Sequence, residues 1–193
     1  MANKYTRIFT PEEAEVILKE GAARNQGKEH LHHWYNNKDP NHLLKINALG
    51  VAGEIALQEI LPGSVRNDSI SMRGDGGIDV IWRGWNFDAK TTTWEKGGHL
   101  YWEILHRPTK TKKKPPTSDI LVLIRRITFK WDKRACVRVS GWLSVPEFWE
   151  IGEKRYWPKS QCDVHLVASS NLRTMKTIYD LPQKGMVQEG LGL

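Results

Sequence analysis

The chain of 193 residues has little cysteine and no long apolar run. Its two cysteines, Cys136 and Cys162, are too few and too isolated for a disulfide framework or a zinc site, and we expect them to be reduced thiols of an intracellular protein. No run of about 18 apolar residues is present and the first residues lack a signal-peptide core, so we expect neither a membrane span nor secretion. The sequence also has no internal repeat.

The chain does have apolar and basic residues in quantity. A hydrophobic content of 39% with nine tryptophans excludes a disordered polypeptide and is sufficient for one domain with its own core. The formal charge is +7, and most of this excess lies in residues 107–116, which carry five cations and no acid: Arg107, Lys110, Lys112, Lys113 and Lys114. Such a localised basic loop predicts a polyanionic partner such as nucleic acid. A solvated surface loop is the alternative.

Periodicity and capping residues predict a mixed α/β (α+β) fold. Thr10 with Glu13 and Ser144 with Glu147 each place a glutamate three residues after a capping hydroxyl, and so predict two helix starts. Helices are expected at 10–23, 41–61 and 146–151, a last helical turn at 172–178, and a meander of strands at 69–73, 77–82, 85–91, 99–106, 119–127 and 135–139, with a late strand at 164–168.

The segment Gly76–Lys90 has the alternation of a β-hairpin. If Arg83-Gly84 is its two-residue turn, Asp79 lies directly opposite Asp88. Alternation then places both aspartates and Lys90 on one face and an almost wholly apolar set on the other.

Two opposed aspartates repel each other. Cross-strand Cβ atoms lie roughly 5 Å apart, and two carboxylates at about that distance repel by about 3 kcal/mol at an effective dielectric of about 20. Lys90 neutralises part of this charge, whereas a divalent cation neutralises it fully, and hard cations take carboxylate ligands. The alternative is a solvent-facing hairpin whose acids splay apart, with Lys90 as an ion-pair partner only.

Glu54 is a third acid, within the helix expected at 41–61. Gly50 and Gly53 lie in the same helix and cost it about 1 kcal/mol each relative to alanine. Glycine at this spacing permits the close approach of another backbone or a ligand. The alternative is that Glu54 is one more exposed helix acid.

Glu54, then Asp79, then Asp88-Ala89-Lys90 resembles the PD-(D/E)xK nuclease superfamily, which has phage and bacterial members. That family pattern is an acid on a helix before the sheet, an acid on one core strand and (D/E)-x-K on the next. Here an apolar residue, Ile78, stands in the place of the proline. The resemblance covers about residues 45–140 and implies a restriction-endonuclease-like core, a central mixed β-sheet flanked by helices. The expected organisation is an N-terminal helical extension at 1–40, the nuclease core at 41–183 and a tail at 184–193.

The resemblance implies a metal-dependent DNA endonuclease that hydrolyses phosphodiester bonds. Asp79, Asp88 and the backbone carbonyl of Ala89 would hold Mg²⁺ or Mn²⁺. Glu54 would lie in the first coordination shell or one water removed, and Lys90 would assist the attacking water. The cations of residues 107–116 would contact the DNA backbone. The alternatives are a Holliday-junction or branched-DNA resolvase of the same superfamily and a catalytically silent nucleic-acid-binding module, and a homodimer is compatible with the enzymes.

Weaker candidates surround this set. Glu103 is a candidate accessory ligand, and Thr92 a candidate phosphate contact. Trp94 and Trp102 are candidates for stacking on bases, although we expect them to pack in the core. His30, His32 and His33 form a cluster that we expect to be solvated.

Overall fold

The structure is a computed structural model that describes residues 4–25, 41–67, 77–92, 98–106, 110–112, 114–130, 134–158 and 161–185. The expected mixed α/β class is confirmed over these residues. The elements are β1 (Thr6–Phe9), α1 (Pro11–Asn25), α2 (His42–Ile60), β2 (Val65–Arg66), β3 (Val80–Trp82), β4 (Trp85–Thr92), β5 (His99–His106), β6 (Thr111–Lys112), β7 (Ile120–Lys130), β8 (Arg134–Ser144), α3 (Val145–Ile151), β9 (Glu153–Trp157), β10 (Cys162–Ala168) and the 3-10 helices η2 (Ser169–Asn171) and η3 (Met175–Asp180).

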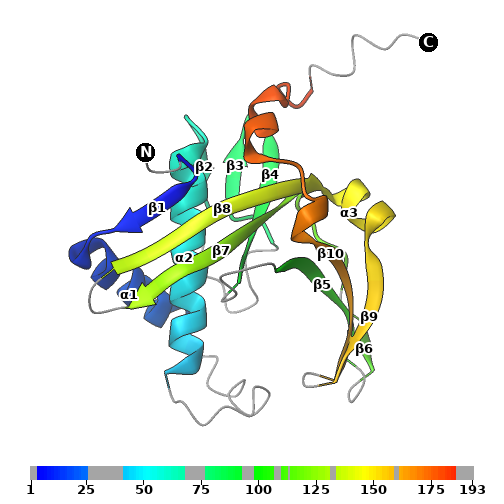
Figure 1. The fold of residues 1–193 in the computed structure, drawn as a ribbon, viewed down its shortest axis with the longest axis horizontal. Coiled ribbons are helices and arrows are strands. Elements are labelled where there is room, and N and C mark those ends of the chain that lie inside the picture. Colours follow the sequence, from blue (N-terminus) through cyan, green and yellow to red (C-terminus); the bar gives the residue numbers. More distant parts are fainter. Residues whose placement is uncertain are drawn as a thin grey trace.

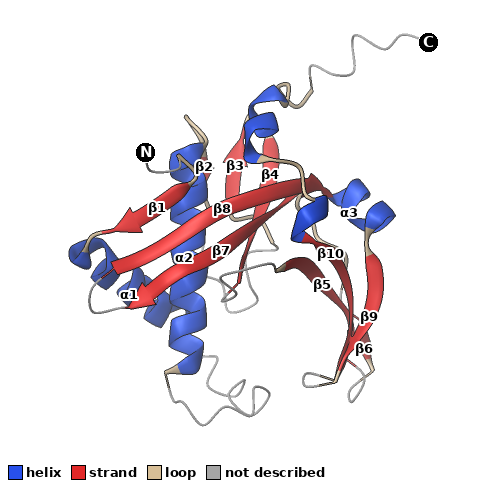
Figure 2. Cartoon of the chain, in the orientation of Figure 1, coloured by secondary structure: helices blue, strands red, loops and turns tan. Residues whose placement is uncertain are grey.

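The described strands form two sheets (Figure 1). The six-stranded sheet has the order β1-β8-β7-β4-β3-β2 and is mixed, because β4 and β7 are parallel while its other neighbours are antiparallel. The smaller sheet has the order β6-β5-β10-β9 and is antiparallel. Figure 2 shows α1 and α2 together on one side of β7 and β8, and α3 where β8 meets the smaller sheet.

Strand β7 is buried on both faces, which explains its uninterrupted apolar run. Residues 120–124 are each at most 1% exposed. Val122 and Ile124 pack into the core formed with α1, α2 and the β3–β4 hairpin, whereas Leu121 and Leu123 pack into a second core with Leu100 of β5 and residues of α3. The larger sheet is therefore the middle layer between the helices and the smaller sheet.

Both predicted capping boxes are confirmed. The Thr10 amide donates to Glu13 Oε2 at 2.8 Å and the Glu13 amide to Thr10 Oγ1 at 3.2 Å. Ser144 and Glu147 exchange the same pair of bonds at the start of α3. These two helices begin where the sequence predicts because the caps satisfy amides that lack a partner within the helix.

The predicted hairpin is confirmed through its turn. Val80 pairs with Phe87 and Trp82 with Trp85. Arg83 and Gly84 both have positive φ, 51° and 77°, as a type I′ turn requires. Arginine is a poor residue for that conformation, but its guanidinium donates to the carbonyls of Tyr179 and Leu181, at 3.2 and 2.7 Å. Contacts with the C-terminal segment therefore offset the unfavourable turn conformation.

Other parts differ from the expectations. The described residues of the 1–40 segment contribute β1 to the edge of the larger sheet, where Thr6 pairs with Arg138, and α1, which packs on α2. The strands are not a simple meander, because β5 and β6 leave the larger sheet and β7 returns parallel to β4. The strand expected at 69–73 lies outside the described residues. None of the described helices is both long and apolar enough to cross a membrane.

The two glycines of α2 have different surroundings. A Cβ at Gly53 would lie 2.1 Å from Thr91 Oγ1 and 3.2 Å from Ile124 Cδ1, whereas one at Gly50 would meet nothing within 4 Å. We expect Gly53→Ala to lower the free energy of unfolding by about 1–3 kcal/mol through overpacking. We expect Gly50→Ala to raise it by about 1 kcal/mol through helix propensity. Urea unfolding of both variants checks this, and equal effects would contradict the assigned packing.

Candidate functional site

Asp88 and Lys90 lie on the face of β4 opposite to Phe87. Asp88 is 2% exposed, and its Oδ2 lies 2.7 Å from Lys90 Nζ. The Lys90 side chain is 29% exposed, so the ion pair joins a buried carboxylate to an ammonium group that solvent or a ligand can reach. β4 itself is fixed by parallel pairing with β7, which includes Asp88 with Leu121 and Lys90 with Leu123.

Asp79 reaches the same segment from the neighbouring strand. In the described residues the β3–β4 ladder ends with the pair Val80 and Phe87. The expected direct pairing of Asp79 with Asp88 is therefore not part of this ladder. Instead the Asp79 amide donates to the Phe87 carbonyl at 2.8 Å, and the Ala89 amide donates to Asp79 Oδ2 at 2.6 Å. The Asp79 carboxylate thereby satisfies a strand amide at the point where β3 diverges. It lies beside the Asp88-Ala89-Lys90 backbone and does not point away from it.

Gly77 leaves room above the Asp88 carboxylate. It has a φ of 79°, and a Cβ built on it would lie 3.4 Å from Asp88 Oδ2 and 3.9 Å from Trp102 Cη2. A side chain at this position would be strained by the positive φ. Gly77 was a sequence signal for this backbone conformation, which the hairpin pattern alone does not explain.

Glu54 is buried and is held by Arg24, the residue that sequence reasoning missed. Glu54 is 4% exposed. Arg24, at the end of α1, donates two hydrogen bonds to its carboxylate, from Nη1 to Oε1 at 2.5 Å and from Nη2 to Oε2 at 2.6 Å. Arg24 also contacts Glu20 at 3.0 Å, and Arg66 contacts Glu20 at 2.9 Å. The alternative of an exposed helix acid is therefore wrong. The only local signal for Arg24 was its spacing four residues after Glu20.

The charges around Arg24 connect the helix acid with the hairpin acid. Burial by itself lowers the pKa of the Arg24 guanidinium, but the hydrogen bond and charge of Glu54, together with the charges of Glu20 and Asp79, outweigh it and raise that pKa. Arg24 therefore stays protonated. The Asp79 carboxylate thus contributes to the electrostatic environment of the guanidinium that binds Glu54.

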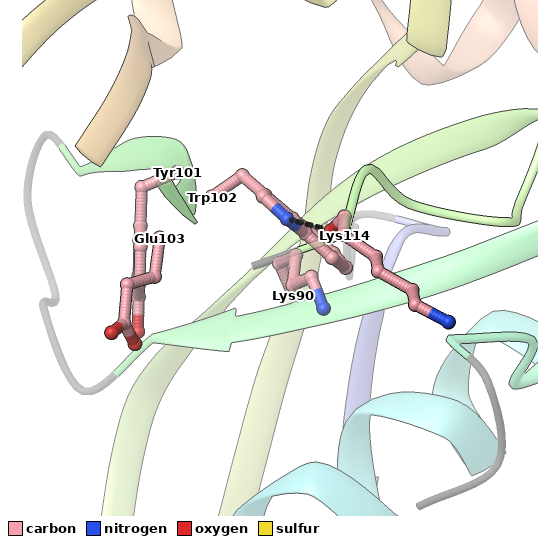
Figure 3. Close-up of a pocket in the computed structure, with 5 residues that line it drawn as sticks. All are labelled: Lys90, Tyr101, Trp102, Glu103 and Lys114. Atoms are coloured by element: carbon pink, nitrogen blue, oxygen red, sulfur yellow. Dashed lines mark hydrogen bonds between the residues drawn. The ribbon is translucent and has the colours of Figure 1, made fainter. Parts of the chain in front are cut away.

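Two hollows meet at Lys90. One, of about 230 Å³, lies between α2 and β4 and is lined by Arg24, Ile46, Asn47, Gly50, Ala89, Lys90, Thr91, Thr92, His99 and Tyr101. The other, of about 270 Å³, is lined by Lys90, Tyr101, Trp102, Glu103 and Lys114 (Figure 3). Thr92 and Glu103 thus both border the site, on different sides of Lys90. Trp94 and the three histidines lie outside the described residues.

The basic segment reaches the second hollow at Lys114. The Trp102 indole N–H donates to the Lys114 carbonyl at 2.9 Å, and β6 pairs with β5 at Leu105 and Lys112. Lys110, Lys112 and Lys114 are exposed. Arg107 and Lys113 lie outside the described residues. Lys114 therefore borders the same hollow as Lys90.

The donor set fits a divalent cation in part. Asp79, Asp88 and the Ala89 carbonyl offer the oxygen ligands that Mg²⁺ and Mn²⁺ take. Glu54, the third acid, is engaged by Arg24. In keeping with this, the described part of the chain contains no group of three His, Cys, Asp or Glu side chains arranged to hold a metal ion.

No protein-family model matches the chain, and neither a curated protein nor a solved structure matches it.

Removing Arg24 tests the buried pair. Arg24→Ala leaves the Glu54 carboxylate buried without the guanidinium, and we expect the free energy of unfolding to fall by about 3–5 kcal/mol. Adding Glu54→Gln removes the uncompensated charge and should recover part of the loss.

The matched control is Arg155→Ala in β9. Arg155 pairs with Glu153 at 2.6 Å, but the two side chains are 60% and 56% exposed, so its loss should cost less than about 1 kcal/mol. Denaturant unfolding of the variants measures these values. An Arg24→Ala protein as stable as Arg155→Ala would show that the Arg24–Glu54 pair is not the buried interaction described here.

Proposed function

We propose that this chain is a metal-dependent endonuclease that hydrolyses phosphodiester bonds in DNA. The observation that carries the proposal is the bond from the Ala89 amide to Asp79 Oδ2. It brings a second buried carboxylate to the segment that holds Asp88 and Lys90, which supports the resemblance to PD-(D/E)xK nucleases.

The gathering of buried acids supports a site for a cation. Four carboxylates, those of Glu20, Glu54, Asp79 and Asp88, lie in this part of the molecule, and Arg24, Arg66 and Lys90 are among the cations that contact them. Burying carboxylates is costly, and apolar residues of similar size are often as stabilising or more so. Several largely buried carboxylates beside a solvent-accessible hollow are therefore an arrangement that favours binding a divalent cation over stability alone.

Each residue has a proposed role. Asp79, Asp88 and the Ala89 carbonyl hold Mg²⁺ or Mn²⁺, which supplies a water of lowered pKa and a Lewis acid for the phosphoryl oxygen. Lys90 is held by Asp88 and reaches the hollow, where its ammonium group stabilises negative charge developing on the phosphate or orients the attacking water. Glu54 acts one water removed, because Arg24 already binds both of its oxygens. The exposed lysines of residues 110–114 contact the DNA backbone.

One observation favours a second candidate, a catalytically silent nucleic-acid-binding module. The guanidinium of Arg24, which donates two hydrogen bonds to Glu54, already compensates the charge of this helix acid. In such a module Asp79 would serve only to satisfy the Ala89 amide. The basic segment would then carry the whole function.

Cleavage assays separate the two candidates. We expect the protein to nick supercoiled DNA with Mg²⁺ or Mn²⁺ and to stop when a chelator is added. Asp88→Asn and Lys90→Ala should each lower the rate by about 10²–10³-fold, because each removes a charge that acts on the reacting phosphate or its metal. A four-way junction assayed beside linear duplex tests the resolvase alternative.

Lys176→Ala is the control for these variants. Lys176 is an exposed lysine on η3, and its variant should cut at the wild-type rate. Cleavage by Asp88→Asn and Lys90→Ala at the wild-type rate would refute the site. Binding that persists with every metal while no substrate is ever cut would establish the silent module instead.

A further inference from the structure

Two aromatic side chains stand together on one face of the smaller sheet. The rings of Tyr101 on β5 and Trp157 on β9 have centroids 4.7 Å apart and are tilted by 51°. Tyr101 pairs with Leu166 and Trp157 with Cys162, so both rings stand on the face of β10 that carries those two residues. The apolar side chains of that face, with Val164, are buried, and Trp157 packs on them. Tyr101 itself is 41% exposed.

Tyr101 borders both of the hollows that meet at Lys90. Figure 3 shows Tyr101 and Glu103 side by side, with Lys90 and Lys114 across the hollow from them. The hollow of about 270 Å³ is close to the lower limit, about 300 Å³, of pockets that hold small ligands. Tyr101 therefore borders the same hollow as the ammonium group that the proposed function assigns to the phosphate.

Trp102 has a different role from Tyr101. Lys90 Nζ lies 4.6 Å from the centre of its ring, and its indole N–H is bonded to the Lys114 carbonyl. Its ring holds the two lysines in place and already has a cation over it. Of the aromatic residues bordering the hollow, Tyr101 is the one with a large exposed fraction.

We propose that Tyr101, supported by Trp157, stacks on an unpaired nucleobase of a bound nucleic-acid strand. Base–aromatic stacking removes apolar ring surface from water and needs an accessible base face, which a base inside a duplex does not offer. Lys90 and Lys114 supply the positive charge for the neighbouring phosphates. The protein then prefers single-stranded or splayed DNA over an intact duplex at this site. The proposal takes the class of ligand, nucleic acid, from the proposed function.

Fluorescence anisotropy tests the stacking contact. The probes are a labelled oligothymidylate of about 15 nucleotides, within the site sizes of single-strand-binding folds, and a blunt duplex of the same length. The titrations contain chelator, so that neither metal nor cleavage enters the result. Tyr101→Ala should weaken binding of the single strand about tenfold and leave binding of the duplex unchanged. Tyr101→Phe, which keeps the ring, should bind like the wild type.

Tyr156→Ala is the matched control. Tyr156 is a tyrosine of β9 that is 43% exposed, and it pairs with Asp163, whose side chain lies on the opposite face of the sheet from Tyr101. Its variant should bind both probes normally. Tyr101→Leu keeps apolar volume over Leu166 and removes only the aromatic face, so it should show the same loss as Tyr101→Ala even if alanine disturbs folding.

Either of two results would overturn the proposal: unchanged single-strand affinity in Tyr101→Ala and Tyr101→Leu, or an equal loss for single strand and duplex. The outcome is separable from the nuclease proposal. A protein that binds single strands through Tyr101 but never cleaves would refute only the nuclease, and one that cleaves but is indifferent to Tyr101 would refute only the stacking contact.

Discussion

The close packing of α2 on β4 is the constraint on which the site depends. At Gly53 the helix comes so near to the strand that Thr91 Oγ1 occupies the space of a Cβ. Glu54 follows directly in the helix, and Ala89 and Lys90 precede Thr91 in the strand. A side chain at residue 53 would push apart the helix that carries Glu54 and the strand that carries Asp88 and Lys90.

Charge compensation is the second requirement, since this neighbourhood gathers buried carboxylates. Asp88 is paired with Lys90, Glu54 with Arg24, and Asp79 accepts from a backbone amide. Each contact lowers the cost of burying a carboxylate. Buried charges that lower the local stability are expected at a functional site, where other parts of the fold supply the stability. Here the doubly buried strand β7 and the helix layer do so.

The parts of the fold that follow from local chemistry could be predicted from the sequence. The caps at Thr10 and Ser144 and the hairpin register depend on neighbouring residues, and the glycines of α2 indicated a close approach, which the structure has at Gly53. The ion pair between Arg24 and Glu54 could not be predicted, because the two residues are 30 positions apart. Nothing in the sequence of either helix indicates that these two side chains meet. Strand β9 was missed because its residues are mostly exposed and lack apolar alternation. The parallel pairing of β7 with β4 depends on tertiary packing, which the periodicity of the sequence does not specify.

The proposed nuclease site requires Asp79 and Asp88 to converge on a place for a divalent cation. Calorimetric titration of the purified protein with Mn²⁺ measures this binding, because the readout requires neither substrate nor cleavage. We expect saturable binding by the wild type and affinity lower by about tenfold or more in Asp88→Asn. Equal Mn²⁺ affinity in the two proteins, or no binding by the wild type, would contradict it.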